Sequence, residues 1–247
     1  MAVALCAAAP IAQADWNLSA DVEHFRWAED TSPSVTETGP RFGLGLGWTQ
    51  DRPAGWELRY EGRLYFGSVD YTGALLLSNT PVTGTTDYRG MTHEGQAVYR
   101  FPDSSLGAEL VAGVGLDLWE RQLSASQSED YRVLYVRLGG NLDRRARTGW
   151  YGGGGVKLPL SVDQDAHFPN IGFSPNPHLE PKGEASLYAQ VGYRFGERLS
   201  LAGYYDSYRF GESNPVTVTE AGTGNAFTFF QPKTKVDTFG LRMRYRF

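Results

Sequence analysis

The sequence predicts an all-β fold, a transmembrane antiparallel up-and-down β-barrel of about ten strands, with eight to twelve strands compatible with the pattern. Segments along the chain alternate apolar and polar residues with the period of two that an extended strand imposes. The gaps between these segments are alternately short and long, and aromatic residues gather at the segment ends. No stretch approaches the roughly 18 apolar residues of a spanning helix, but a barrel strand needs only one apolar face. At 247 residues the chain suits a single barrel.

The N-terminal residues predict export. The apolar run 2–9 contains Cys6, the only cysteine of the chain, and 12–14 reads Ala-Gln-Ala, a small-x-small cleavage motif before Asp15. A basic segment that usually precedes such a run is missing, so we expect a signal peptide truncated at its start. We therefore predict a signal peptide at 1–14 and one barrel domain at 15–247.

Ten alternating segments follow, each long enough for the roughly 9–11 residues that a tilted strand needs to cross a bilayer. They lie at approximately 16–27, 40–50, 56–68, 89–101, 106–119, 131–142, 149–162, 183–195, 199–210 and 234–247. In the third, apolar residues such as Leu58 and Leu64 alternate with charged residues such as Arg59 and Arg63. Glycine rows in the second, fifth and seventh segments leave room into which long side chains of neighbouring rows can reach.

The last segment shows the clearest alternation. One face is apolar and ends in an aromatic residue: Phe239, Leu241, Met243, Tyr245 and Phe247. The other face carries Arg242, Arg244 and Arg246. Three arginines are costly in an ordinary core, whereas in a barrel they face a wet interior. The segment resembles the C-terminal assembly signal of bacterial outer-membrane proteins, which implies the barrel-assembly machinery as a partner.

The gaps predict the orientation. The short gaps 51–55, 102–105, 143–148 and 196–198 are rich in Asp, Gly, Pro or Ser, which favour turns. The long gaps lie near 28–39, 70–88, 120–130, 163–182 and 211–233. Outer-membrane barrels have short periplasmic turns and long extracellular loops, so we expect both termini in the periplasm.

Aromatic residues at the segment ends predict two girdles in the headgroup zones. The inner girdle is expected to comprise Trp16, Trp48, Trp56, Tyr99, Trp150, Phe195 and Phe247. The outer girdle is expected to comprise Phe25, Trp27, Phe66, Trp119, Tyr131, Tyr205 and Phe239.

The inward face is expected to carry a charged network: Glu57, Arg59, Glu61, Arg63, Glu94, Arg100, Glu109, Asp117, Arg137, Lys157, Glu184, Arg194, Arg242, Arg244 and Arg246. Acids and bases nearly balance, so they can pair across strands, with Asp21 and Glu23 expected opposite the terminal arginines. A salt-bridged plug and a narrow water-filled pore that attracts a small anionic solute both remain open. A wide general-diffusion pore is not expected, because eight strands are just filled by side chains and ten lie close to that limit.

Catalytic chemistry has less support. His167 and His178 share one long gap with Asp163 and Asp165, which keeps a metal or acid–base cluster open, although the prolines there indicate an irregular surface loop. The chain lacks the paired aspartates with Asp-x-His of the omptin proteases and the His-x-Ser pair of the lipid A deacylases. We therefore predict no catalytic residues, no metal and no cofactor, with an outer-membrane hydrolase acting at the extracellular rim as the alternative.

The outer gaps and the surface suggest partners. Leu75, Leu76, Leu77, Phe227, Phe229 and Phe230 place apolar side chains in segments expected to face outside. They either pack on each other or bind a ligand or partner. Lys233, Lys235 and Arg209 are expected near lipopolysaccharide phosphates, and a net charge of −5 gives no reason to propose nucleic acid. Across most of its length the sequence resembles small Gram-negative outer-membrane β-barrel proteins of the porin-like kind, which implies an integral location in the outer membrane.

Overall fold

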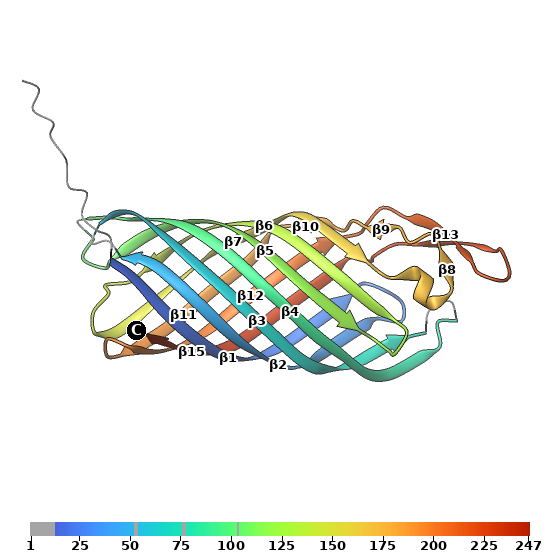
Figure 1. Cartoon of the computed structure of the whole chain (residues 1–247), viewed down its shortest axis with the longest axis horizontal. Helices are drawn as coiled ribbons and strands as arrows, with labels where there is room; N and C mark the ends of the chain where they lie inside the picture. The colour runs from blue at the N-terminus through green and yellow to red at the C-terminus, as the bar shows by residue number, and fades with distance from the viewer. Residues whose placement is uncertain (1–12, 52–53, 76–77, 103) are drawn as a thin grey trace, which may run out of the picture.

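The computed structural model describes residues 13–51, 54–75, 78–102 and 104–247, and over these residues it is an all-β, closed antiparallel barrel of ten strands (Figure 1). The expected signal peptide lies almost wholly outside the described residues. The barrel strands are β1 (Gln13–Glu29), β2 (Val35–Asp51), β3 (Gly55–Ala74), β4 (Pro81–Arg100), β5 (Ala108–Gln122), β6 (Ser128–Leu142), β7 (Thr148–Asp165), β11 (Ser186–Phe195), β12 (Leu199–Gly211) and β15 (Thr234–Arg246). No described helix is long and apolar enough to span a membrane.

The first and last strands close the barrel. β1 pairs with β15 from Asn17 opposite Arg246 to Glu29 opposite Thr234, and β15 pairs with β12 on its other side. A short strand, β10 (Lys182–Glu184), pairs with the far end of β12 and continues the wall beyond β11. Among the described residues, each of the ten barrel strands pairs with a neighbour on both sides, which is the condition for a sheet to lie in lipid.

The period-two alternation places apolar side chains outside and polar side chains inside. On β1, Ser19, Asp21 and Glu23 are buried, whereas Leu18 and Val22 are about half exposed on the outer surface. On β3 the outward apolar face runs from Trp56 to Phe66, eleven positions, which matches the length that a tilted strand needs to cross a bilayer.

Several strands continue well beyond the membrane crossing. β3 and β4 have 20 residues each, for example. The connections between the first six strands are therefore short, at 30–34, 75–80 and 123–127. The sequence had predicted long loops there, at 28–39, 70–88 and 120–130. The outward face of β4 becomes polar here, at Thr83, Thr85, Asp87 and Arg89. Alternation of apolar and polar residues then gives no signal, although the β-branched threonines still favour a strand.

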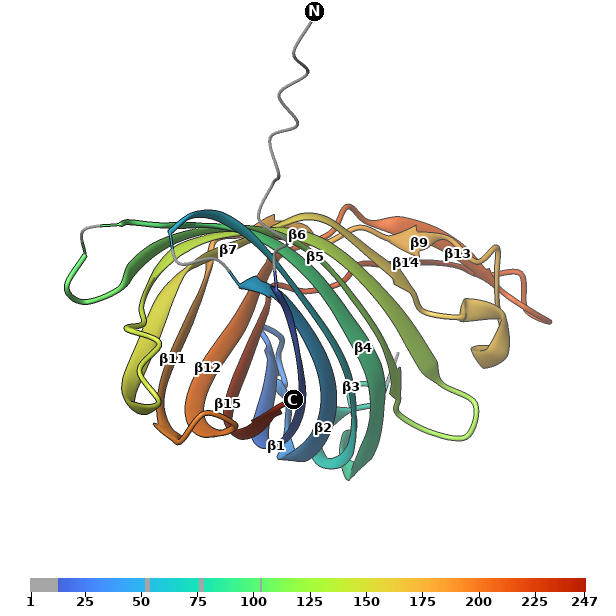
Figure 2. The same ribbon diagram turned by 60° about the vertical axis from the view of Figure 1, so that its left-hand side comes forward.

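The last two long segments, 166–181 and 212–233, fold into what we call the cap. It contains η1 (Phe168–Ile171), β8 (Phe173–Ser174), β9 (His178–Leu179), β13 (Val216–Glu220) and β14 (Ala226–Phe229), with β14, β13 and β8 forming a small sheet. Its core buries Phe168, Phe173, Leu179 and Val218, with Phe227 and Phe229 packed against them. The cap lies at the end of the barrel opposite the C-terminus and the short turns (Figures 1 and 2).

The expected outer girdle is wrong for four of its seven residues. Phe25, Trp27, Trp119 and Tyr131 point into the barrel and are at most 7 % exposed. They occupy inward-facing positions of strands that continue past the membrane. The girdle was predicted from their place near the segment ends, without regard to the face on which they lie. Phe66 and Phe239 do face outward.

Candidate functional site

The half of the lumen nearer the cap is filled by aromatic side chains, which we call the plug: Phe25, Trp27, Tyr88, Trp119, Tyr131, Tyr208 and Phe210. Trp119 stacks on Tyr131 with ring centroids 4.9 Å apart, and Trp27 meets the same ring edge-on at 5.5 Å. Stacked and edge-to-face pairs are the arrangements that aromatic rings favour. All seven side chains belong to one buried apolar cluster, so this part of the lumen is built as a core.

A buried ion layer accompanies the plug. The Arg121 guanidinium lies 2.7 Å from Glu37, 2.8 Å from Glu129 and 3.3 Å from Glu29, and its side chain is only 3 % exposed. The same guanidinium lies 4.9 Å from the Trp27 ring centre, and the Tyr88 hydroxyl donates to Glu37. One cation thus holds three buried carboxylates, an arrangement in which loss of the cation is costly.

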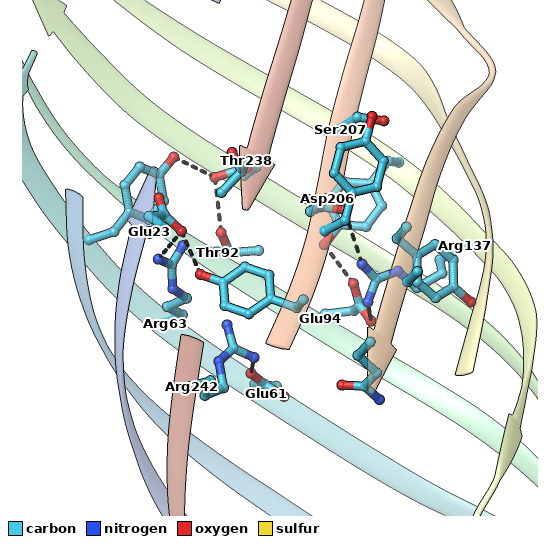
Figure 3. Close-up of a pocket in the computed structure, with 18 of the residues that line it drawn as sticks. Glu23, Glu61, Arg63, Thr92, Glu94, Arg137, Asp206, Ser207, Thr238 and Arg242 are labelled. Atoms are coloured by element: carbon cyan, nitrogen blue, oxygen red, sulfur yellow. Dashed lines mark hydrogen bonds and ion pairs between the residues drawn. The ribbon is translucent and has the colours of Figure 1, made fainter. Parts of the chain in front are cut away.

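The middle of the lumen holds a first network of paired charges, drawn in Figure 3. Arg63 donates to both Asp21 and Glu23, and the Tyr204 hydroxyl donates to Glu23 at 2.6 Å. Glu61 accepts from Arg242, and from Arg244 at 2.9 Å. The side chains of Asp21 and Glu23 are fully buried among these donors, which is the condition for burying charge at low cost, whereas Glu61 is 32 % exposed.

Glycines make this network possible. A Cβ at Gly43 would meet Asp21 Oδ2 at 2.5 Å and Arg63 Nε at 2.7 Å, so the guanidinium lies directly over the glycine. The ring of Tyr135 occupies the corresponding space at Gly115. The glycine rows therefore provide the space that their sequence pattern indicated.

A second network lies on the opposite wall. Arg137 bridges Glu94 at 3.0 Å and Asp206 at 3.4 Å, and Asp206 also pairs with Lys157 at 2.5 Å. The Lys157 ammonium lies 3.4 Å from the centre of the Tyr208 ring. Asp117 accepts hydrogen bonds from the hydroxyls of Tyr65, Tyr208 and Thr92 at 2.9 to 3.0 Å. Tyr208 of the plug is thus hydrogen-bonded to a charged residue below it.

A third network lies at the short-turn end of the lumen. Glu57 and Glu109 have fully buried side chains, and both accept from Arg59 and Arg145. Arg100 reaches Glu109 at 3.4 Å, and Arg246 reaches Asp15 at 3.4 Å.

The turn residue Asp143 takes a bidentate contact from Arg194, with both distances 2.6 Å. Burial raises the pKa of the Asp143 carboxyl, but the Arg194 hydrogen bonds and charge outweigh burial, so the net pKa is lowered. This carboxyl is therefore ionised in the neutral range and holds Arg194 at the mouth of the lumen.

Two adjoining cavities run through these networks. One has a volume of about 230 Å³ and ends against Trp27, Tyr88 and Trp119 of the plug. The other, about 160 Å³, lies at the short-turn end. Asn17, Thr49, Arg59, Asn141, Gln190 and Arg244 line both. The lumen is thus hollow from the short turns up to the plug.

The structure places the expected network residues in the lumen with one exception. Glu184 lies at the rim near the cap, where its side chain is 42 % exposed and pairs with Lys233 at 3.5 Å. Across the strands, Glu184 pairs with Arg209, which faces outward. The prediction that Glu184 faces the lumen is therefore wrong. It lies where the wall passes from β11 to β10.

Sequence reasoning missed other members. Glu37, Arg121, Asp143 and Arg145 lie in segments that were assigned to loops and turns, so no face was assigned to them. Asp206 carried a usable signal, because it alternates with the inward-facing Tyr204 and Tyr208 along β12.

The outer ends of β6 and β7 bring together the histidines and aspartates that the sequence had singled out. His178 Nδ1 lies 2.6 Å from Asp163, and His167 Nε2 lies 3.1 Å from Asp130. Asp165 stands between the two rings, 3.5 Å from His167 and 3.7 Å from His178. Within the described part of the chain, no group of three or more His, Cys, Asp or Glu side chains is arranged to hold a metal ion.

A closed antiparallel barrel with an apolar outer belt, aromatic residues at the short-turn end and a polar interior defines an outer-membrane β-barrel protein. No model of a known protein family matches the sequence, and no curated protein sequence matches it significantly.

Three solved structures are similar to the chain over nearly its whole length. Neisserial surface protein A is 11 % identical, with 95 % of this chain and 99 % of that chain covered and a TM-score of 0.36. The outer membrane protease OmpT from Escherichia coli is 10 % identical, with 95 % and 96 % covered and a TM-score of 0.41. The transport unit of the autotransporter AIDA-I from Escherichia coli is 12 % identical, with 99 % and 93 % covered and a TM-score of 0.48. Similarity at this level transfers no function to the chain.

Proposed function

We propose that the chain is a non-enzymatic outer-membrane barrel with a closed lumen, which acts outside the cell through its cap. The plug carries this proposal. Seven large aromatic side chains, each at most 7 % exposed, occupy the lumen at the level where a channel would have to continue. The Arg121 ion layer accompanies them, and buried charges in such a layer hold fixed positions.

The orientation follows from the asymmetry of the two ends. The start of β1, the C-terminus and the short turns lie at one end, whereas the extended strands and the cap lie at the other (Figure 2). Outer-membrane barrels carry short turns on the periplasmic side, which supports periplasmic termini and an extracellular cap. The cap has its own buried core, so its surface is ordered before any partner arrives and binding costs less entropy.

Contacts with lipopolysaccharide stay a prediction. Two of the three cations expected to make them have carboxylate partners of their own: Arg209 lies 2.5 Å from Asp237, and Lys233 lies 3.5 Å from Glu184. Lys235 is exposed on the outer wall and remains the best candidate for a phosphate contact.

Single-channel recording in a planar bilayer tests the closed barrel. Refolded protein that shows the heat-dependent gel mobility of a folded barrel should give no conductance steps above the bare membrane. Regular conductance steps, of either ion selectivity, would refute the closed lumen.

The second candidate is a hydrolase at the extracellular rim, favoured by the two aspartate-held histidines. A carboxylate that fixes a histidine ring prepares it to act as a general base. Cleavage of a peptide library, or a mass change in lipopolysaccharide, that His178→Gln abolishes would establish this activity. His24→Gln is the matched control, because His24 is an exposed histidine on the barrel wall that contacts Thr38.

A further inference from the structure

The cavity at the short-turn end, which we call the vestibule, has a wall rich in guanidinium groups. Its arginines are Arg59, Arg145, Arg194, Arg198, Arg244 and Arg246. Its acids are Asp15, Asp143 and Glu197. The lining therefore carries six cations against three anions.

The carboxylates that offset this surplus stand behind the arginines. Glu57 and Glu109 have side-chain exposures of 0 %, whereas Arg59 and Arg145 in front of them are 20–21 % exposed. Arg244 and Arg246 are more open, at 32 % and 46 %. Arg244 pairs with Glu61 and Arg246 pairs with Asp15, and a guanidinium has five N–H donors in a planar fork, so these two arginines can each offer donors to a second acceptor.

The other end of the lumen has the opposite balance. There, in the ion pairs of the described residues, three carboxylates share one cation, Arg121: they belong to Glu29, Glu37 and Glu129. Charge is thus segregated along the lumen axis, and low-dielectric walls strengthen the field that a mobile ion experiences inside. An anion entering from the short turns meets a favourable potential first and the acid-rich ion layer last.

We propose that the vestibule binds a small oxyanion that carries two or more phosphate or carboxylate groups and enters from the short-turn end. Paired oxygens of such a group match the fork of an arginine. The plug closes the lumen above the vestibule, so the oxyanion is bound there and does not cross the barrel. The proposal goes beyond the closed-barrel function and does not depend on the cap.

Pyrophosphate is a suitable probe, measured by titration calorimetry on the refolded barrel in an uncharged detergent at low ionic strength. We expect saturable binding that weakens as salt is added, because exposed charges are screened. The double variant Arg244→Gln with Arg246→Gln should weaken binding at least tenfold. Glu61 keeps Arg242 as a partner and Asp15 is partly exposed, so the variant leaves no fully buried carboxylate alone and should fold.

Arg147→Gln is the control for loss of an arginine at the same end. Arg147 is 84 % exposed and does not line the vestibule, although its partner Glu197 does. Because this surface pair is exposed and screened, the variant should weaken pyrophosphate binding far less than the double variant. Citrate should compete because it offers the same kind of oxygens.

Three results would overturn the proposal: no saturable binding to folded protein at millimolar pyrophosphate, equal losses in Arg147→Gln and the double variant, or no competition by citrate. Binding is measured without a membrane. A failure here is therefore separate from a failure of the closed-barrel proposal, which rests on conductance.

Discussion

At the scale of single residues, alternation predicts which way a side chain points but not which side chain it meets. The sequence indicated that Arg244 faces the lumen and would pair with Asp21 or Glu23 on the neighbouring strand. Arg242 does lie opposite Asp21 and 3.4 Å from it, as expected. Arg244 instead joins Arg242 on Glu61 of β3, two strands further round the wall, and Arg63 is hydrogen-bonded to both Asp21 and Glu23. Arginines reach this far because small residues such as Ser19 and Gly45 lie in the rows between. Pairing across a lumen depends on curvature and reach, which a one-dimensional pattern lacks.

Arg121→Gln should be the most destabilising single change among the lumen arginines. It leaves Glu29, Glu37 and Glu129 buried without their cation, and breaking such a pair costs about 3–5 kcal/mol. Denaturant unfolding of the refolded barrel measures the effect.

Arg89→Gln is the control for this change, since Arg89 is 76 % exposed and pairs with Glu120 on the outer surface. An exposed pair contributes about 0–1 kcal/mol. Equal losses in the two variants would mean that the ion layer is hydrated and contributes no more than a surface pair.

At the scale of elements, the membrane-crossing parts of the strands could be predicted closely, because one apolar face repeats through each of them. Above the membrane the apolar face ends, and with it the signal for a strand. The sequence therefore predicted loops in segments through which β3 and β4 continue. The cap strands have two to five residues each, too short for periodicity to be recognised. Phe227, Phe229 and Phe230 were noted as apolar residues of an outer segment, but the pairing of β13 with β8 depends on contacts between two distant segments.

Outward- and inward-facing positions of the wall should respond differently to the same substitution. Val191→Arg places a charge on the lipid face, where Val191 is 57 % exposed, and should cost about 2–4 kcal/mol near the midplane. Gln190→Arg enters the cavity side and should be much milder. Urea unfolding in lipid vesicles compares them, and a similar loss for both would contradict the assigned faces.

The last strand should matter more for assembly in cells than for stability. Phe247 is 64 % exposed and its backbone N–H donates to Trp16 at 3.0 Å, so its ring adds little buried area. Deleting Phe247 should reduce the amount of barrel in the membrane fraction while refolding in detergent stays nearly unchanged. Normal membrane levels of the deletion would show that the terminal aromatic ring is dispensable.

At the scale of the whole molecule, the lumen is divided along its axis. A guanidinium-rich cavity lies at the short-turn end, paired networks lie in the middle, and the plug with its ion layer lies towards the cap. The sequence left plug and pore as alternatives because aromatic residues near strand ends suit either a girdle or a lumen. The barrel places these side chains on the inward parity of strands that extend beyond the membrane, and this position supports the proposed closed lumen.

Access to the lumen from one end only is the central claim, and thiol labelling tests it most directly. Asn141→Cys places a thiol in the cavities below the plug, and Thr219→Cys places one on β13 of the cap. A membrane-impermeant maleimide should label Thr219→Cys in intact cells, and should label Asn141→Cys only when the periplasm is opened. Labelling of Asn141→Cys in intact cells as fast as Thr219→Cys would contradict a lumen closed towards the cap.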